Sequence, residues 1–186
     1  MMRNKKTIVI SVLAVALAAA AVFAMRGENS SEAYANEATG ISFKVPSGWN
    51  IKETKIPGID AETTIAANSP DFVFVADDRE FPPNGTVQSG YEFNVWVQKP
   101  SNVKNFEELQ AFYKLGSEGH IVQEEETVTW NGQPALRHKL GDFKSGQLFD
   151  LHTVNEGRWI TISFSAPADD SEAKALFERI LGSVEL

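Results

Sequence analysis

The chain has 186 residues, with 17 basic and 25 acidic side chains and a formal net charge of −8. It contains no cysteine, which excludes disulfides, thiolate zinc sites and the lipid attachment of a lipoprotein. Three of the basic residues lie among the first six, so 14 oppose 25 acidic ones over the rest, a net charge of −11. Such a surface repels phosphate backbones, and no nucleic-acid partner is expected.

The N-terminus has the pattern of an export segment. Arg3, Lys5 and Lys6 precede an uncharged apolar run over residues 7–25. A basic head stays cytoplasmic while the apolar part enters the bilayer. Two outcomes stay open: residues 1–25 are a cleaved signal peptide, or a retained membrane anchor, since the run approaches the ~20 residues that span a bilayer. Either outcome predicts an extracytoplasmic location, with the membrane reached through this segment.

Behind the export segment, one domain is expected. Residues 26–39 are polar and rich in small side chains, which is typical of a linker. Residues 40–186 have the length of a common single domain. Residues 41–45 alternate apolar and polar side chains, as do residues 91–97, and both segments are predicted to be strands. Residues 62–67 and 72–76 are also predicted to be strands.

Two helices are predicted. Asn105 is a plausible N-cap with Glu108 at the capping-box position, and Gly116 ends that helix. In the C-terminal helix, Asp169 and Glu172 form the expected cap pair. Apolar side chains then recur at helical spacing, namely Ala173, Leu176, Phe177, Ile180, Leu181 and Val184.

Two hairpins are predicted between the helices. A two-residue turn at Asn131-Gly132 places Glu126 opposite Arg137 and Glu124 opposite Lys139. A turn at Glu156-Gly157 aligns a second set of partners, namely Thr153 with Ile160, Leu151 with Ile162 and Phe149 with Phe164. Runs of strands divided by isolated helices predict an α+β fold with an antiparallel sheet covered by helices.

The second hairpin also brings together the residue types of a hydrolase. Asp150 and His152 share one face, and Ser163 and Thr161 lie opposite them. A serine nucleophile normally sits on a strained turn beside oxyanion donors, not in the middle of a strand. Alternating polar residues are also typical of the solvated face of a sheet. We therefore expect no catalytic residues and no enzyme activity.

One loop offers a candidate metal site. The three histidines of the chain are not at the spacings of a zinc motif. Asp77, Asp78 and Glu80 form a compact carboxylate cluster, and calcium prefers grouped oxygen ligands. The cluster lacks the alternating ligand pattern of a calcium loop, so a solvated loop is the alternative interpretation. No cofactor is expected.

Two aromatic side chains are candidates for contact with a partner. Phe81 lies in the long loop after residue 77 and either contacts a partner or anchors the loop in the core. Trp96 lies on the face opposite the apolar set of its strand, where a packed helix is the simpler explanation.

Several short motifs resemble PsbP-like domains. They are GISFKVPSGW at the start of the domain, the VTWNGQPA hairpin, RWITISFSAP and the closing SEAKALFERILGSVEL. The fold is shared by the photosystem II extrinsic protein PsbP, a Ran-binding nuclear import factor and envelope lipoproteins such as DcrB. The resemblance covers residues 40–186 and implies an α/β/α sandwich in proteins that mostly bind other proteins. We therefore expect a non-enzymatic accessory domain with a protein partner in the cell envelope or membrane.

Overall fold

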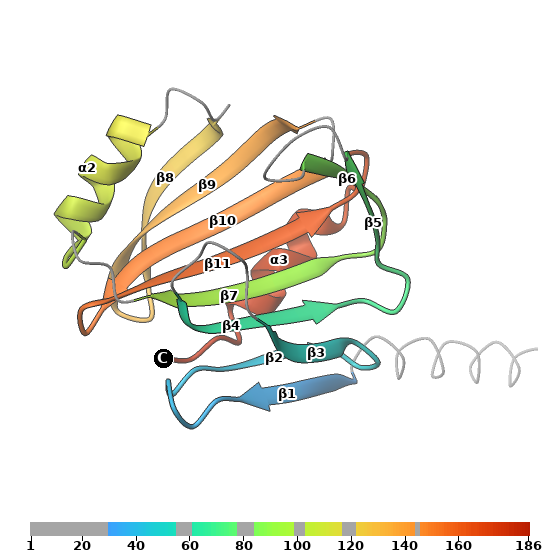
Figure 1. Cartoon of the computed structure of the whole chain (residues 1–186), viewed down its shortest axis with the longest axis horizontal. Helices are drawn as coiled ribbons and strands as arrows, with labels where there is room; N and C mark the ends of the chain where they lie inside the picture. Colours follow the sequence, from blue (N-terminus) through green and yellow to red (C-terminus); the bar gives the residue numbers. More distant parts are fainter. Residues whose placement is uncertain (1–29, 55–60, 78–83, 99–102, 117–121, 144–145) are drawn as a thin grey trace, which may run out of the picture.

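A computed structural model of the chain describes residues 30–54, 61–77, 84–98, 103–116, 122–143 and 146–186 (Figure 1). Among these residues, no helix has the length and apolar character needed to cross a membrane. The apolar run at residues 7–25 lies outside the described part, so its role as signal or anchor stays a prediction.

The domain is built on one seven-stranded antiparallel sheet, in the order β3-β4-β7-β11-β10-β9-β8. Its strands are β3 (Asn50–Thr54), β4 (Ala61–Asn68), β7 (Glu92–Gln98), β8 (Val122–Trp130), β9 (Gln133–Phe143), β10 (Gly146–Asn155) and β11 (Arg158–Ala166). The two predicted hairpins form the half of the sheet from β8 to β11, and both predicted registers are confirmed. Asn131 and Glu156 have φ values of 48° and 51°, and each is followed by a glycine of positive φ, as type I′ turns require.

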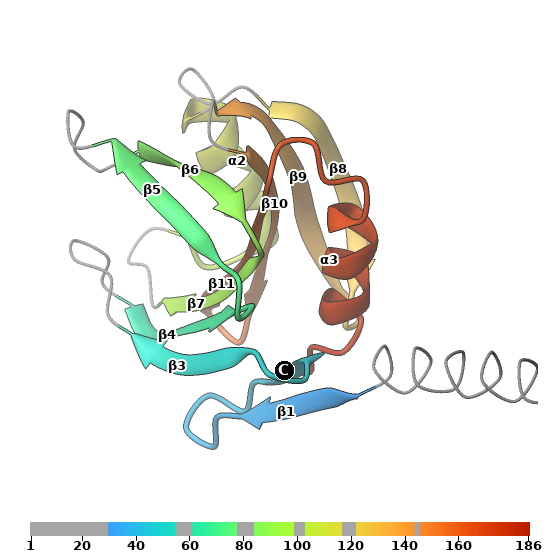
Figure 2. The same ribbon diagram turned by 90° about the vertical axis from the view of Figure 1, so that its right-hand side faces the viewer.

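Two helices cover the sheet on opposite faces (Figure 2). The helix α3 (Ala173–Leu181) packs on one face, and α2 (Phe106–Gly116) lies over one end of the other. The predicted N-cap of α2 is confirmed, because the Glu108 N–H donates to Asn105 Oδ1 at 2.9 Å. The Glu108 carboxylate does not complete a capping box, since it accepts the N–H of Lys104 at 2.6 Å rather than that of Asn105. For α3 the predicted cap pair of Asp169 and Glu172 is wrong: Glu172 itself is the N-cap, its side chain makes no cap hydrogen bond, and its N–H donates to Asp170 Oδ1 at 2.8 Å.

The face under α3 carries the hydrophobic core. Side chains of alternate strand residues, among them Val95, Ile162 and Phe164, are 0% exposed and pack against α3. The strand β2 (Ser42–Pro46) closes the core beside α3, with Phe43 1% exposed. It pairs with β1 (Ser31–Ala35), so part of the stretch predicted to be a linker is instead a strand of the domain. Sequence pattern missed β1 because SEAYA has little apolar alternation.

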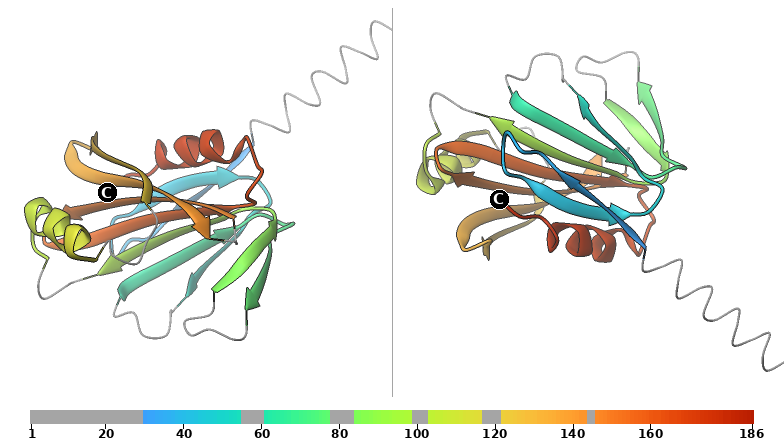
Figure 3. Two further views of the ribbon diagram at one scale, coloured as in Figure 1. Left: turned by 90° about the horizontal axis from the view of Figure 1, so that it is seen from above. Right: turned by 90° about the horizontal axis from the view of Figure 1, so that it is seen from below.

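A separate two-stranded sheet stands on the side opposite α3 (Figures 2 and 3). It consists of β5 (Val73–Asp77) and β6 (Asn84–Ser89). The ring of Phe74 lies over Gly85, where any side chain would collide with it. This two-stranded sheet and α2 lie toward opposite ends of the large sheet (Figure 1).

Candidate functional site

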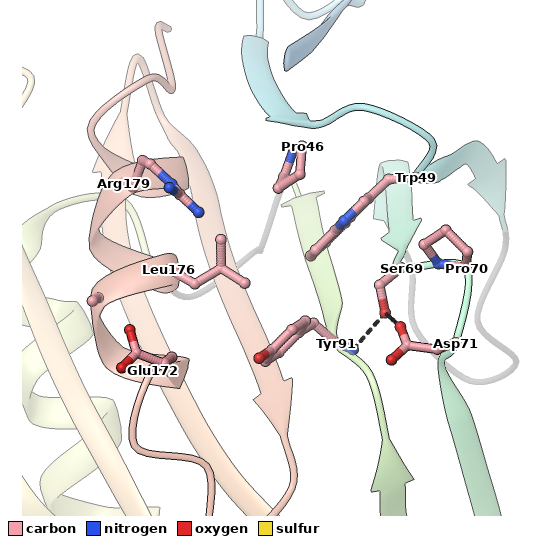
Figure 4. Close-up of a pocket in the computed structure, with 10 residues that line it drawn as sticks. Pro46, Trp49, Ser69, Pro70, Asp71, Tyr91, Glu172, Leu176 and Arg179 are labelled. Carbon is pink, nitrogen blue, oxygen red and sulfur yellow. Dashed lines mark hydrogen bonds between the residues drawn. The ribbon is translucent and has the colours of Figure 1, made fainter. Parts of the chain in front are cut away.

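An open groove lies between α3 and the turns that follow β2 and β4 (Figure 4). Its volume is about 410 Å³, within the range of small-ligand and side-chain binding sites. The groove is lined by Pro46, Trp49, Ser69, Pro70, Asp71, Tyr91, Glu172, Ala175, Leu176 and Arg179. These residues come from four separate segments, so only the folded chain brings them together.

Two stacked aromatic rings form the inner wall of the groove. The rings of Trp49 and Tyr91 are nearly parallel, at 6° and with centroids 6.2 Å apart. Tyr91 also stacks on Phe164 of the core at 5.7 Å. The Tyr91 hydroxyl donates to Asp170 Oδ2 at 2.6 Å, and this bond, with burial, raises the pKa of Tyr91 to about 12. The wall is therefore rigid, and Tyr91 is neutral at physiological pH.

Two glycines allow the segments of the wall to approach one another. Gly48, with φ of 86°, turns the chain between Pro46 and Trp49. Gly90, with φ of 70°, lies so close to Ser69 and the backbone of Phe72 that a Cβ atom would collide with both. The turn after β4 therefore packs directly against the start of β7.

The lining of the groove combines one serine hydroxyl, apolar side chains and three charged residues. Ser69 is the serine that lines the groove. Its hydroxyl donates to Asp71 Oδ1 at 2.7 Å and accepts a hydrogen bond from the Tyr91 N–H at 2.8 Å. Both roles hold the turn in place. Aromatic, proline and aliphatic side chains line the interior of the groove. Its charged residues are Asp71, Glu172 and Arg179. Such a surface suits apolar or proline side chains of a ligand with charged neighbours.

A second candidate region is a buried polar cluster on the α2 face of the large sheet. Its members are Tyr113, His138, Asp150, His152, Thr161 and Ser163. His152 is 4% exposed and Asp150 9%, so this face is covered and the prediction of a solvated face is wrong. The ring of Tyr113 in α2 lies 4.5 Å from that of His152, which shows that α2 supplies part of the cover.

Burial shifts the two ionisable side chains at the centre of the cluster. It raises the pKa of Asp150 to about 7, against a smaller lowering by the Ser163 hydrogen bond. Burial, with a smaller contribution from His138, lowers the pKa of His152 to about 3. Both groups are thus held toward their neutral forms, Asp150 in acid to neutral solution and His152 throughout the physiological range.

The cluster does not have the geometry of a hydrolase triad. His152 Nδ1 lies 2.9 Å from the Tyr113 hydroxyl and 3.0 Å from Thr161 Oγ1, while His152 Nε2 is 4.0 Å from Asp150 Oδ2. Ser163 hydrogen-bonds to Asp150. The sequence placed these residues on one face correctly, but the serine contacts the acid and the histidine contacts other hydroxyls. A triad needs a serine bonded to the histidine.

Of the other predicted site residues, Trp96 lies within β7, and those of the loop after β5 lie mostly outside the described residues. Asp77 ends β5, while its side chain, Asp78, Glu80 and Phe81 lie outside the described residues, so the calcium and contact predictions there stay untested. Within the described part, no group of three or more His, Asp or Glu side chains could hold a metal ion. Trp96 is half-buried, and its buried Nε1 has no hydrogen-bond partner there.

Sequence reasoning missed the groove, although one signal pointed to it. The Pro-Ser-Gly-Trp motif after residue 45 marked a turn, and in the structure Pro46 and Trp49 become groove walls. The partners of that motif, Tyr91 and Leu176, lie far away in the sequence and looked like ordinary core residues.

The fold matches that of a solved protein. The chain is similar to the solution structure of cyanobacterial PsbP (CyanoP) from Synechocystis sp. PCC 6803, with a TM-score of 0.55 and 19% sequence identity. The match covers 84% of this chain and 92% of that one. No protein-family model and no curated protein sequence matches. The expected PsbP-like fold is therefore confirmed, and the identity is low enough that the likeness concerns the fold alone.

Proposed function

We propose that this protein is a non-enzymatic accessory domain of the cell envelope that binds a partner protein through the groove beside α3. The observation that carries the proposal is the rigid aromatic wall of Trp49 and Tyr91 facing an open space of about 410 Å³. Aromatic rings fixed in a concave site are typical of binding energy concentrated in a few residues. The groove's own serine is already engaged in two structural bonds, which favours binding over catalysis.

The export segment at residues 1–25 supports the location in the envelope, whether it is cleaved or retained as an anchor. The net charge of −11 beyond it favours a protein partner over nucleic acid. A direct test is protease added to cells whose outer layers have been opened but whose cytoplasmic membrane is intact. Digestion of the domain is expected, and full protection would contradict the proposed location.

Site-specific photo-crosslinking tests the groove. Ala175 is an exposed residue of α3 that lines the groove, and Ala111 is an exposed alanine of α2 on the other side of the domain. A photoreactive phenylalanine analogue at Ala175 is expected to crosslink a partner in intact cells, and the same analogue at Ala111 is not.

A charge variant makes this test specific. Glu172→Lys reverses one charge of the groove at an exposed side chain and is expected to weaken the crosslink from Ala175 severalfold. Equal crosslinking from Ala175 and Ala111, or none from Ala175, would contradict the use of the groove.

A further inference from the structure

The strand β5 exposes an unusual amount of apolar surface. Val73, Phe74 and Val75 are 44%, 47% and 46% exposed, although they are consecutive. Successive strand residues point to opposite faces, so apolar surface is partly exposed on both faces of β5. Isolated exposed apolar residues are common on proteins, but a contiguous apolar strand is typical of an interaction surface.

The outer edge of β5 is also unpaired within the described residues. β5 pairs with β6 along one edge, and no described strand pairs along the other. An open edge presents backbone N–H and C=O groups that a further strand can bond. Figure 2 shows β5 on the outside of the molecule, with β6 between it and the large sheet.

A third strand would improve the stability of this small sheet. A two-stranded hairpin is marginally stable in water, whereas three strands with an apolar face hold together well. The edge strand β8 of the large sheet is protected differently, because it carries Glu124, Glu125 and Glu126, all exposed. Charges on an edge strand oppose the addition of a strand, and β5 has none between Val73 and Val75.

The charges at the two ends of β5 indicate which segment it would accept. Asp71 precedes the strand and Asp77 ends it. Antiparallel pairing of two copies centred on Phe74 would bring position 71 of one copy level with position 77 of the other, and both positions are aspartate. Like charges directly opposite destabilise a strand pair, whereas opposite charges stabilise it. A second copy is therefore disfavoured, and basic ends are favoured.

We propose that the free edge of β5 binds an extended segment of a partner protein by strand addition, and that this segment has an apolar centre flanked by basic residues. The free edge of β5 is distinct from the groove, but the two lie close along the chain: Asp71 lines the groove, and β5 begins two residues later at Val73. A partner strand on β5 therefore continues toward the groove. The main-chain hydrogen bonds supply affinity, and the charges at the ends supply selectivity.

Synthetic peptides and the full-length protein test this proposal by fluorescence anisotropy. The first probe is a nine-residue peptide of alternating valine and threonine with a lysine at each end, and the second has glutamate at both ends. We expect the lysine-ended peptide to bind at least tenfold more tightly. Equal affinity of the two peptides would overturn the proposed selectivity.

Variants of the protein locate the binding. Val75→Lys and the uncharged Val75→Ser are each expected to weaken binding of the lysine-ended peptide at least fivefold. Thr129 is an exposed residue of β8, an edge strand of the large sheet. Thr129→Lys is expected to leave binding of the lysine-ended peptide unchanged. Should Val75→Lys fail to fold, Val73→Lys makes the same test. Unchanged binding to the folded Val75 variants would overturn the assignment to β5.

Two further measurements separate the alternatives. Hydrogen exchange is expected to slow at residues 73–77 when the lysine-ended peptide is added, and slowing only in segments that line the groove would overturn the proposal. In sedimentation the protein without peptide is expected to be a monomer. A dimer that Val75→Lys dissociates would assign the edge to a second copy and also overturn it. The crosslinking from Ala175 is independent of these results, so either proposal can fail alone.

Discussion

At the centre of the large sheet both faces are buried, but by opposite chemistry. Under α3, Val95, Ile162 and Phe164 are 0% exposed. On the α2 face, Thr161 and Ser163 of the same strand β11 are 3% and 5% exposed. Burial of apolar area is favourable in itself, at roughly 25 cal/mol per Å². Burial of a polar group costs free energy because the group loses its hydration. Hydrogen bonds within the protein offset this cost.

The polar face is incompletely satisfied. Among the described residues, three buried side-chain atoms of the α2 face have no hydrogen-bond partner, namely Asp150 Oδ1, Trp96 Nε1 and Trp159 Nε1. On the α3 face, Arg137 Nε is in the same position, although the guanidinium bonds to Glu178. The α3 face therefore supplies most of the stability. The α2 face contributes less and makes stability depend on pH.

The largest effect is expected from removing a ring on the α3 face. Phe164 packs against the rings of Tyr91, Phe149 and Phe177. Phe164→Ala should lower the free energy of unfolding by about 3–5 kcal/mol, because it leaves a cavity in the core. The matched change on the other face, Ser163→Ala, should cost about 1 kcal/mol. Urea unfolding measures both, and equal losses would contradict the contrast between the faces.

The next effect is on pH dependence. Asp150 has a pKa of about 7 in the folded state against 3.8 ordinarily, so stability falls as pH rises between these values. His152 has a pKa of about 3 against 6.5, so stability falls as pH drops between those values. Between pH 3.8 and 6.5 the two contributions have opposite slopes. They therefore largely cancel in the pH dependence of the stability of the parent protein.

Single variants should reveal each slope. Relative to the parent, the stability of Asp150→Asn should rise with pH by about 1.4 kcal/mol per unit across this window, and that of His152→Gln should fall by a similar amount. Urea unfolding at several pH values between 4 and 6.5 makes the measurement. Profiles parallel to that of the parent would show that burial does not perturb these groups as described.

A smaller contrast concerns the two tyrosines that tie the helical layers to the sheet. Tyr91→Phe removes a bond to the Asp170 carboxylate and should cost about 1.5 kcal/mol. Tyr113→Phe should cost less, about 0.5–1 kcal/mol, because His152 Nδ1 keeps Thr161 Oγ1 as a partner. Thermal unfolding of both variants gives the comparison, and the reverse order would contradict it.

The smallest effect is expected at the edge of the sheet. The register places Glu126 opposite Arg137, as predicted. However, Arg137 forms an ion pair with Glu178 of α3, at 2.8 Å. Glu126→Gln should therefore change stability by less than about 0.5 kcal/mol, while Glu178→Gln should cost about 1 kcal/mol. A larger loss for Glu126→Gln would show that the cross-strand pair matters more than the pair with the helix.

Local signals predicted the local structure well. Asn-Gly and Glu-Gly turns fixed the two hairpin registers, since a two-residue turn leaves one alignment that keeps the apolar side chains on one face. The N-cap residue of α2 was correct for the same reason: capping involves neighbours along the chain. The strands β3 and β6 were not predicted, because neither NIKET nor NGTVQS carries a run of alternating apolar residues.

Local sequence signals did not predict the groove. The turn at Trp49 was visible in the sequence, yet its stacking on Tyr91 and the facing Leu176 and Arg179 are contacts between segments more than 40 residues apart. The polar cluster was found on one face but assigned to solvent, because the pattern of a strand does not show what covers it.

The sequence by itself determined the hairpins, the two helices and the division of the hairpin strands into an apolar and a polar face. These follow from side-chain period and turn chemistry, which act over a few residues. Only the tertiary structure decided that α2 covers the polar face, that Ser163 bonds to Asp150 rather than to His152, and that β5 keeps an open apolar edge. Each depends on which distant segments pack together, and that choice is set by the burial of the whole core.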